Sequence, residues 1–176
     1  MQRAVLAAIV FASALANADP APGDDAATRA HSRVSGTLGL FTPTGSLGVE
    51  YTQAALPTFE IGAGVGVGFS GPQASIMPRL RIGDGLQAIV LGAGASGGRL
   101  VIPVLFCFDG CTDTRTTALW VNVEAGIQAT TSGGVTLSAY GGLSRVVAHG
   151  ACTGDQCDRV DRLMLPYAGF ALGHTL

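Results

Sequence analysis

The sequence is poor in charge, and it contains no lysine. Charged residues make up 12% of its 176 residues, about half of the ~25% that soluble domains usually carry. All ten basic residues are arginine, and the formal net charge is -2, so no basic field is present that would attract nucleic acid. Aromatic residues are also few, at 6%. These deficits exclude a nucleic-acid partner and a densely packed aromatic core, and they suit a protein whose exterior need not be wetted.

The residue patterns needed for catalysis or cofactor binding are missing as well. The only histidines are His31, His149 and His174, and none shares a predicted strand face with a serine and a carboxylate, as nucleophilic catalysis requires. The glycine runs at 62–68 and 92–98 are not phosphate-binding loops, because no helix is predicted after them and no lysine is available. We therefore predict that the protein is not an enzyme and binds no cofactor or metal.

The N-terminal segment has the pattern of a secretory signal peptide. A short positive stretch containing Arg3 precedes an uncharged, mostly apolar run from Ala4 to Leu15. Ala16 and Ala18 then form the small-x-small site that signal peptidase cuts, which predicts a signal peptide over 1–18 and a mature chain beginning at Asp19. The apolar run is too short for a membrane-spanning helix, which needs about 20 residues.

Four cysteines occur in two short polar stretches, CFDGC and CTGDQC. An exported protein meets an oxidising compartment, where an even number of cysteines indicates disulfides. Four cysteines allow three pairings, of which we favour the two local bridges, Cys107–Cys111 and Cys152–Cys157. A zinc site is the alternative, but the C-x-x-C spacing typical of zinc knuckles is absent.

Apolar and polar residues alternate with period two from Val34 onward, which is the pattern of β-strands. In segment 58–69 every second residue from Phe59 to Phe69 is apolar, and the alternate positions from Thr58 to Gly68 hold one threonine, one glutamate and four glycines. Segment 117–130 follows the same rule. By contrast, residues 19–33 are rich in Pro, Ala and Asp without any period, which predicts a flexible leader.

The alternating segments predict an all-β domain over 34–176. Eight strands are expected from Gly45 onward. Val34–Phe41 adds a ninth segment, or forms one broken first strand with 45–53, so the expected count lies between eight and ten. The predicted strands cover 45–53, 58–69, 75–82, 86–94, 99–108, 117–130, 134–148 and 163–176.

The polar face of these strands is too poor in charge to be the outer surface of a soluble sheet. If the apolar face contacts lipid and the small polar residues fill a narrow interior, the pattern is explained. Lipid also requires every backbone polar group to be paired, which closure of the sheet provides. We therefore predict a closed antiparallel up-and-down transmembrane β-barrel.

The threading of the strands predicts which loops lie outside the cell. Bacterial barrels usually have both termini in the periplasm, short periplasmic turns and longer outer loops. Eight strands threaded in this way place the cysteine-bearing stretches 107–116 and 149–162 on the outer side. The shorter turns at 70–74, 95–98 and 131–133 are then expected on the periplasmic side.

Five charged residues fall on the predicted inward face of the strands. In a barrel of eight strands the interior is just wide enough for side chains, so opposite charges confined there are expected to pair as a polar plug. The alternative is a polar pathway for small solutes. The predicted interior charges are Glu50, Glu60, Arg79, Arg81 and Glu124.

The signal peptide, the glycine-rich alternating strands and the last strand together resemble the small, eight-stranded outer-membrane β-barrels of Gram-negative bacteria. In that family the last strand carries alternating apolar residues up to a C-terminal aromatic residue, which the assembly machinery reads. Ala168, Phe170, Leu172 and Leu176 keep this spacing, whereas His174 interrupts it and Leu176 replaces the aromatic residue. The resemblance implies a location in the bacterial outer membrane, with membrane lipids and the barrel assembly machinery as partners.

Three functions are compatible with these observations. The first is a structural or surface-exposed barrel with a plugged lumen, whose disulfide-closed outer loops at 107–116 and 149–162 contact an extracellular partner. The second is a narrow pore for small solutes. The third is a soluble, lipocalin-like carrier in the periplasm.

The disulfide interpretation predicts no free thiols in the exported protein. Peptide mapping without reduction should recover Cys107 linked to Cys111 and Cys152 linked to Cys157. The same digest after reduction and alkylation is the control. Four alkylated cysteines in the unreduced sample would contradict the prediction.

Overall fold

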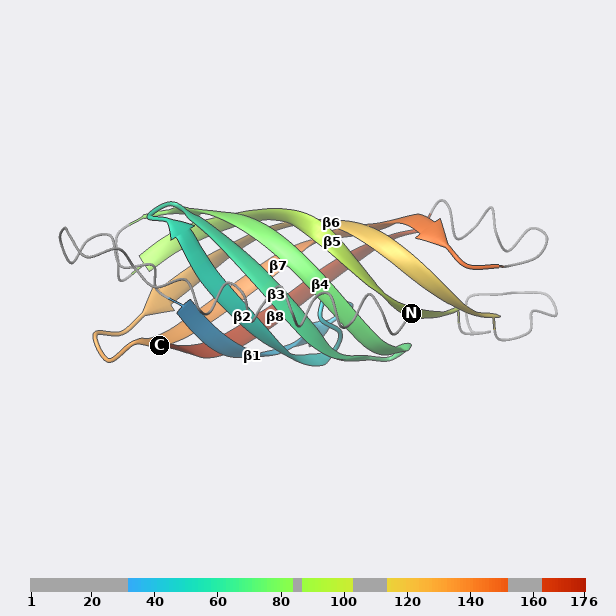
Figure 1. Ribbon diagram of the computed structural model, residues 1–176, viewed down its shortest axis with the longest axis horizontal. Coiled ribbons are helices and arrows are strands. Elements are labelled where there is room, and N and C mark those ends of the chain that lie inside the picture. The colour runs from blue at the N-terminus through green and yellow to red at the C-terminus, as the bar shows by residue number, and fades with distance from the viewer. Residues whose placement is uncertain (1–31, 84–86, 103–113, 152–162) are drawn as a thin grey trace.

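The computed structural model describes residues 32–83, 87–102, 114–151 and 163–176 of the chain. These residues form a single closed barrel of eight antiparallel strands, in which each strand pairs with the next along the chain and the first pairs with the last (Figure 1). No helix in the described part of the chain is long and apolar enough to cross a membrane. The predicted leader lies outside the described residues up to position 31, as do the signal peptide and its cleavage site at Ala16, Ala18 and Asp19.

The ladder between β1 and β8 closes the barrel. It runs from Arg33 opposite Thr175 to Leu40 opposite Ala168, so neither terminal strand keeps a free edge over that length. The eight strands are β1 (Ser32–Leu40), β2 (Leu47–Leu56), β3 (Phe59–Gly68), β4 (Gly71–Ile82), β5 (Gln87–Ile102), β6 (Thr114–Thr130), β7 (Val135–His149) and β8 (Met164–Thr175).

The strand count of eight is confirmed, but two of the assignments behind it are wrong. Segments 86–94 and 99–108 were predicted as separate strands, whereas 87–102 forms one continuous strand, β5. The glycines and serine around 95–98 looked like a turn, yet they pair in register with both β4 and β6. Val34–Phe41, the supernumerary segment, is essentially the full first strand. The predicted count was right because the extra strand from splitting β5 compensated for leaving β1 out of the count.

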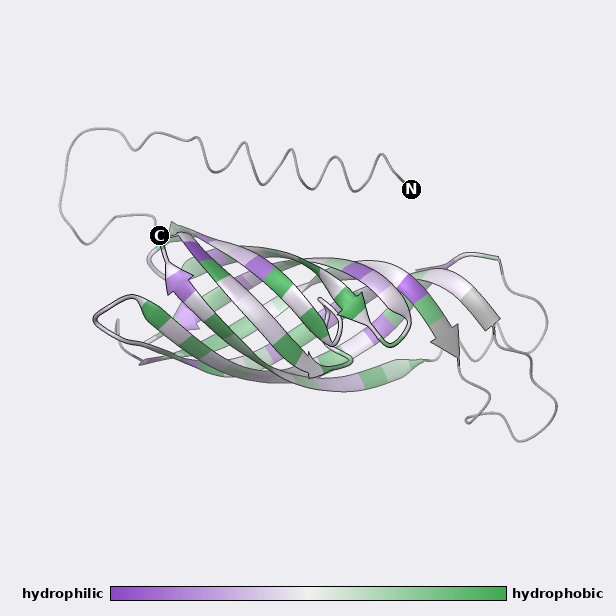
Figure 2. Cartoon of the chain, turned by 90° about the horizontal axis from the view of Figure 1, so that it is seen from below, coloured by the Kyte–Doolittle hydropathy of each residue, from purple (hydrophilic) through white to green (hydrophobic). Residues whose placement is uncertain are grey.

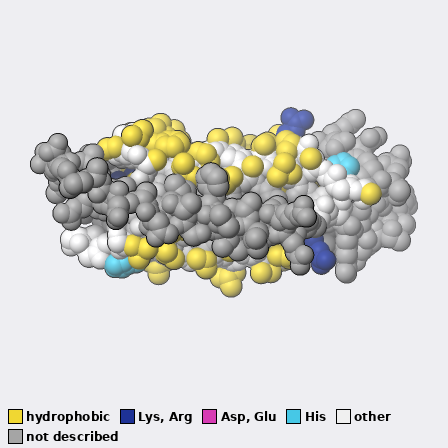
Figure 3. All heavy atoms as spheres, in the orientation of Figure 1, with side chains coloured by type: hydrophobic (Ala, Val, Ile, Leu, Met, Phe, Trp, Pro, Cys, Tyr) yellow, Lys and Arg dark blue, Asp and Glu magenta, His cyan; other side chains and the backbone are white. Residues whose placement is uncertain are grey.

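The polarity of the barrel is the reverse of that of a soluble protein. Hydrophobic and hydrophilic residues alternate along the strands (Figure 2), and the large apolar side chains are mostly exposed whereas most hydroxyl, amide and carboxylate side chains are buried. Leu47 and Val49 are 66% and 53% exposed, whereas Glu50 and Thr52 are 7% and 1% exposed. On the face seen in Figure 3, apolar side chains gather along the described part of the barrel wall. The alternation therefore gives the barrel an apolar exterior and a polar interior.

The connections at the two ends of the barrel differ. The turns after β2, β4 and β6 lie at the end that holds the start of β1 and the end of β8. The connections after β1, β3, β5 and β7 lie at the opposite end, which we call the outer end. The predicted turn at 70–74 was assigned to the wrong end, because leaving Val34–Phe41 out of the strand count reversed the threading of all segments before the false break at 95–98. The connections that carry the cysteines start and finish at the outer end, while Cys107, Cys111, Cys152 and Cys157 themselves lie outside the described residues.

The barrel is taller on one side. β5, β6 and β7 have 16, 17 and 15 residues, compared with 9, 10 and 10 in β1, β2 and β3. The tall side projects at the outer end, where its inward face changes from polar to apolar. Leu100, Ala118, Trp120 and Val146 are buried together there, with Leu163 packed against them.

Two prolines that fall inside strands sit where a ladder is already interrupted. Pro78 lies in the gap of the β4–β5 pairing between Ile76 and Arg79. Pro166 pairs with β7 but lies beyond the end of the β1 ladder, which begins at Ala168. A residue without an N–H group removes a ladder hydrogen bond, and at these two positions one neighbouring ladder is absent in any case.

Candidate functional site

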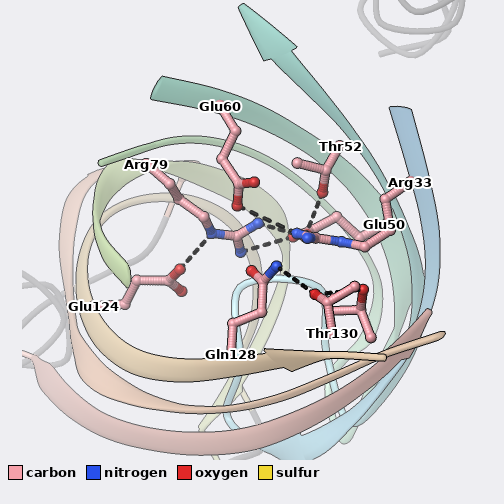
Figure 4. Close-up of polar contacts among 9 residues, drawn as sticks. Arg33, Glu50, Thr52, Glu60, Arg79, Glu124, Gln128 and Thr130 are labelled. Atoms are coloured by element: carbon pink, nitrogen blue, oxygen red, sulfur yellow. Dashed lines mark hydrogen bonds and ion pairs between the residues drawn. The ribbon is translucent and has the colours of Figure 1, made fainter. Parts of the chain in front are cut away.

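A triad of charged side chains occupies the middle of the barrel interior. Arg79 on β4 reaches between Glu50 on β2 and Glu124 on β6, and all three are 7% exposed (Figure 4). Its Nε donates to Glu124 Oε1 at 2.5 Å, while Nη1 and Nη2 both donate to the Glu50 carboxylate, Nη2 to Oε2 at 2.9 Å. The guanidinium therefore links strands on opposite parts of the wall, and we call these three residues the Arg79 cluster.

Glycines on the inward face leave room for this cluster. A Cβ atom at Gly62 would lie 2.7 Å from Nη1 of Arg79, and one at Gly92 would lie 2.7 Å from Cγ of Glu124. The period-two glycines that mark the sequence of β3 thus have a steric role, because larger inward residues would displace the ion pairs. Thr52 adds a hydroxyl that donates to Glu50 Oε1 at 3.2 Å.

A second ion pair lies nearer the end that holds the termini. Arg33 Nη2 lies 3.2 Å from Glu60 Oε1. The pair joins the beginnings of β1 and β3 inside the barrel (Figure 4). Sequence reasoning assigned Arg33 to the flexible leader, because the strand alternation was recognised only from Val34. Arg81 shares the inward face of β4 with Arg79 and is half-buried.

The space between the two ion pairs is small. A cavity of about 30 Å³ is lined by both pairs together with Gln128 and Tyr140. A water molecule needs about 10–15 Å³ of such volume, so the cavity accommodates one or two water molecules.

The connection between β1 and β2 folds into the barrel. Thr42 to Gly45 are buried throughout, with Thr42 2% and Thr44 3% exposed. The Thr44 hydroxyl bonds that of Thr37 at 3.0 Å, and Ser46 N–H donates to the carbonyl of Val67 at 2.9 Å. We call Thr42–Gly45 the inner loop.

Glycines make space for the inner loop as well. A Cβ atom at Gly66 would lie 2.3 Å from the carbonyl oxygen of Thr44, and one at Gly39 would lie 2.4 Å from Cγ2 of Thr42. Gly45 has φ +93°, a backbone conformation that residues with a side chain rarely adopt. The sequence signal here was Thr-Pro-Thr-Gly, which predicted a turn correctly but gave no indication that the turn points inward.

Between the inner loop and the outer end, neutral side chains bridge the wall. Asn122 donates to Ser96 Oγ at 3.0 Å and accepts from the Ser144 hydroxyl at 2.6 Å. These three residues come from β6, β5 and β7, and each is 5% exposed or less. These three interior side chains thus bond to one another, which offsets the loss of water around them.

The described histidines lie far apart in the barrel. His149 ends β7 at the outer end, and His174 lies near the end of β8 at the opposite end, whereas His31 lies outside the described residues. Across the described ranges, no three His, Cys, Asp or Glu side chains are grouped so that they would hold a metal ion.

The arrangement of the Arg79 cluster is suited to bracing the barrel and obstructing its lumen.

No protein-family model matches the sequence, and no curated protein matches it. Among solved structures, the N-terminal β-barrel domain of OprF from Pseudomonas aeruginosa is similar, with a TM-score of 0.58 and 12% identity over 85% of this chain and 99% of that one. Ail of Yersinia pestis has a TM-score of 0.45 and 11% identity over 84% and 100% of the two chains. Neisserial surface protein A has a TM-score of 0.44 and 10% identity over 83% and 94%.

At such low identity the likeness concerns the fold. The closed antiparallel barrel of eight strands is confirmed by the pairing of the strands and by the similarity to the OprF domain. The chain therefore has the fold of the small, eight-stranded outer-membrane β-barrels.

Removal of the Arg79 charge should destabilise the barrel strongly. Arg79→Met leaves Glu50 and Glu124 as buried, unpaired carboxylates, and breaking a buried pair in this way costs about 3–5 kcal/mol. Urea unfolding of the protein refolded into zwitterionic vesicles measures the loss in the free energy of unfolding.

Two further variants separate the charge effect from the loss of side-chain volume. E50Q/R79M/E124Q should recover much of the lost stability, because no buried charge is left over. Arg99→Met, at an exposed position on the outer wall, should change stability little. An R79M protein as stable as the wild type would show that the cluster does not brace the barrel.

Proposed function

We propose that the protein is a barrel of the bacterial outer membrane with a closed lumen, which serves a structural or surface-interaction role. The observation that carries this proposal is the combination of an apolar exterior with an interior filled by mutually bonded polar side chains. Export by the predicted signal peptide over 1–18 and insertion by the barrel assembly machinery belong to the same proposal.

The apolar exterior supports a membrane setting over a soluble carrier. A lipocalin-like carrier would need a polar exterior and an apolar cavity, which is the opposite of the observed polarity. Phe41 and Phe69 lie with their ring centroids 6.0 Å apart at the outer end of the short side, and they are 52% and 75% exposed. Aromatic side chains at the edge of an apolar band are typical of the membrane interface.

The filled interior favours a plug over a pore. A solute crossing the barrel would have to pass the Arg79 cluster and then the inner loop. These are separate obstructions, one held by ion pairs and the other by hydroxyl and backbone hydrogen bonds. The pore alternative requires both to move.

The tall side of the barrel supports a surface role. β5 and β6 continue in register to the pair of Ile102 and Thr114, beyond the outer ends of β1 to β4. The outer ends of β5, β6 and β7 thus extend beyond those of the shorter strands. We propose that the loops at 107–116 and 149–162, each closed by a local disulfide, contact an extracellular partner. We propose no enzymatic role for the protein.

The membrane assignment predicts two properties of the native protein. It should remain in the membrane fraction that resists Sarkosyl extraction, and its folded form should migrate differently from its boiled form on a gel. A periplasmic protein expressed in the same cells is the control for soluble release. Recovery of the chain in the soluble periplasm would contradict the assignment.

The closed lumen predicts that the wild-type protein does not conduct steadily in planar bilayers. E50A/R79A/E124A should also lack steady open steps, because the inner loop still blocks the outer half. The same triple variant with the inner loop deleted should conduct, provided that its heat-modifiable migration shows a folded barrel. Steady open steps from the wild type would instead support the pore alternative.

A further inference from the structure

The inner loop, Thr42–Gly45, is bounded by two residues with left-handed backbone conformations. Phe41 precedes the loop with φ +56°, and Gly45 ends it with φ +93°. Among the described residues other than glycine, Phe41 is the only one with a positive φ. A bulky residue adopts this conformation at a cost in free energy, because its Cβ atom comes close to the following carbonyl oxygen. A rearrangement that returns Phe41 to a negative φ would therefore relieve backbone strain.

Several hydrogen bonds of the inner loop are internal and would move with it. The Gly45 N–H donates to the Thr42 carbonyl at 2.8 Å, and the Thr42 hydroxyl donates to the Gly45 carbonyl. Directly after the loop, the hydroxyl oxygen of Ser46 is buried without a hydrogen-bond partner among the described residues. An unpaired buried group of this kind reduces stability. The inward position of the loop thus includes a hydroxyl that water would satisfy if the loop moved.

The barrel wall around the inner loop is a recess made by glycines. A Cβ atom at Gly64 would lie 2.4 Å from Cγ2 of Thr44, and one at Gly169 would lie 2.9 Å from Cγ2 of Thr42. Glycine has no side chain that could fill the space if the loop left. Departure of the loop would therefore leave a recess open to water from the outer end, while the Arg79 cluster would still obstruct the lumen.

An aromatic contact on the outside of the barrel stabilises the inward position. The ring centroids of Phe41 and Phe69 are 6.0 Å apart and the ring planes are tilted by 50°, a geometry in which aromatic rings attract each other. Phe69 directly follows β3, whose ladder with β4 continues to the pair of Gly68 and Gly71. The contact therefore ties Phe41, at the start of the loop, to a part of the wall that is itself held by strand pairing.

We propose that the inner loop is a hinged plug of the lumen. It turns at Phe41 and Gly45 between the observed inward state and an outward state in which Thr42 and Thr44 lie on the outer surface. The contact between Phe41 and Phe69 is the latch that holds the inward state, and the left-handed strain at Phe41 opposes it. The inference rests on the proposed closed lumen, and it adds that one of the two obstructions is movable.

Labelling of a cysteine in the loop tests whether the loop leaves the lumen. T44C is introduced into a chain whose four native cysteines are replaced by serine. Intact cells are then treated with a polyethylene glycol maleimide too large to cross the outer membrane. Thr44 is 3% exposed, so labelling requires the outward state and should be slow. T136C is the control, because Thr136 is 1% exposed and lies on β7 near the opposite end, and it should not be labelled.

Variants of the two phenylalanines separate the latch from the strain, and all of them carry T44C, so its own effect cancels. F69A removes the latch, and labelling should become about tenfold faster. F41A/F69A and F41G/F69A lack both rings, but glycine adopts the left-handed conformation freely whereas alanine does not. F41G/F69A should therefore be labelled about fivefold more slowly than F41A/F69A. Because Phe69 is 75% exposed, its truncation should leave the barrel folded.

Three results would overturn the inference. Labelling of T44C no faster than that of T136C in every variant would show that the loop stays in the lumen. An unchanged rate in F69A would exclude the latch, and equal rates in F41A/F69A and F41G/F69A would exclude strain at Phe41. Rates refer to protein with heat-modifiable migration, and F69L replaces F69A if the latter does not fold. Recovery of the wild type in the soluble periplasm would refute the proposed function, whereas a membrane-inserted barrel with unlabelled T44C would refute this inference alone.

Discussion

The ladder between β1 and β8 is the contact on which the rest of the barrel depends. It pairs Arg33 through Leu40 with the last strand and leaves no free edge along that height. Without it the sheet would expose a row of backbone donors and acceptors that a lipid environment cannot satisfy. Closure also gives the sheet two distinct faces, so that each strand residue faces either the lumen or the outside.

Closure creates a confined interior in which polar groups must satisfy one another. Arg79 donates hydrogen bonds to the carboxylates of Glu50 and Glu124, and Asn122 forms hydrogen bonds with two serine hydroxyls. Glycine is as important as charge here, because the inward wall must leave space for the long side chains and for the inner loop. The low aromatic content and high glycine content of the chain are thus two consequences of one narrow lumen.

The two sides of the barrel carry different structures at the outer end. The short side ends in an aromatic pair, Phe41 and Phe69, and in a loop that turns inward. The tall side carries outward arginines and, on its inner face, a small apolar core around Trp120. This asymmetry follows from strand length: beyond the ends of β1 to β4 the extended strands no longer enclose a lumen, so their inner face packs against itself like that of a soluble sheet.

Period-two alternation, low charge and the placement of glycines determined the fold class, the reversed polarity and the inward direction of Glu50, Glu60, Arg79 and Glu124 from the sequence alone. These are local properties of a strand, since neighbouring residues necessarily face opposite sides. The tertiary structure decided which segments are strands in full: Ser96 and its glycine neighbours form part of β5 because partners on both sides hold them extended. It also decided that Arg33 pairs with Glu60 and that the Thr42–Gly45 turn enters the lumen. Both depend on residues distant in the chain, and only barrel closure brings those residues together.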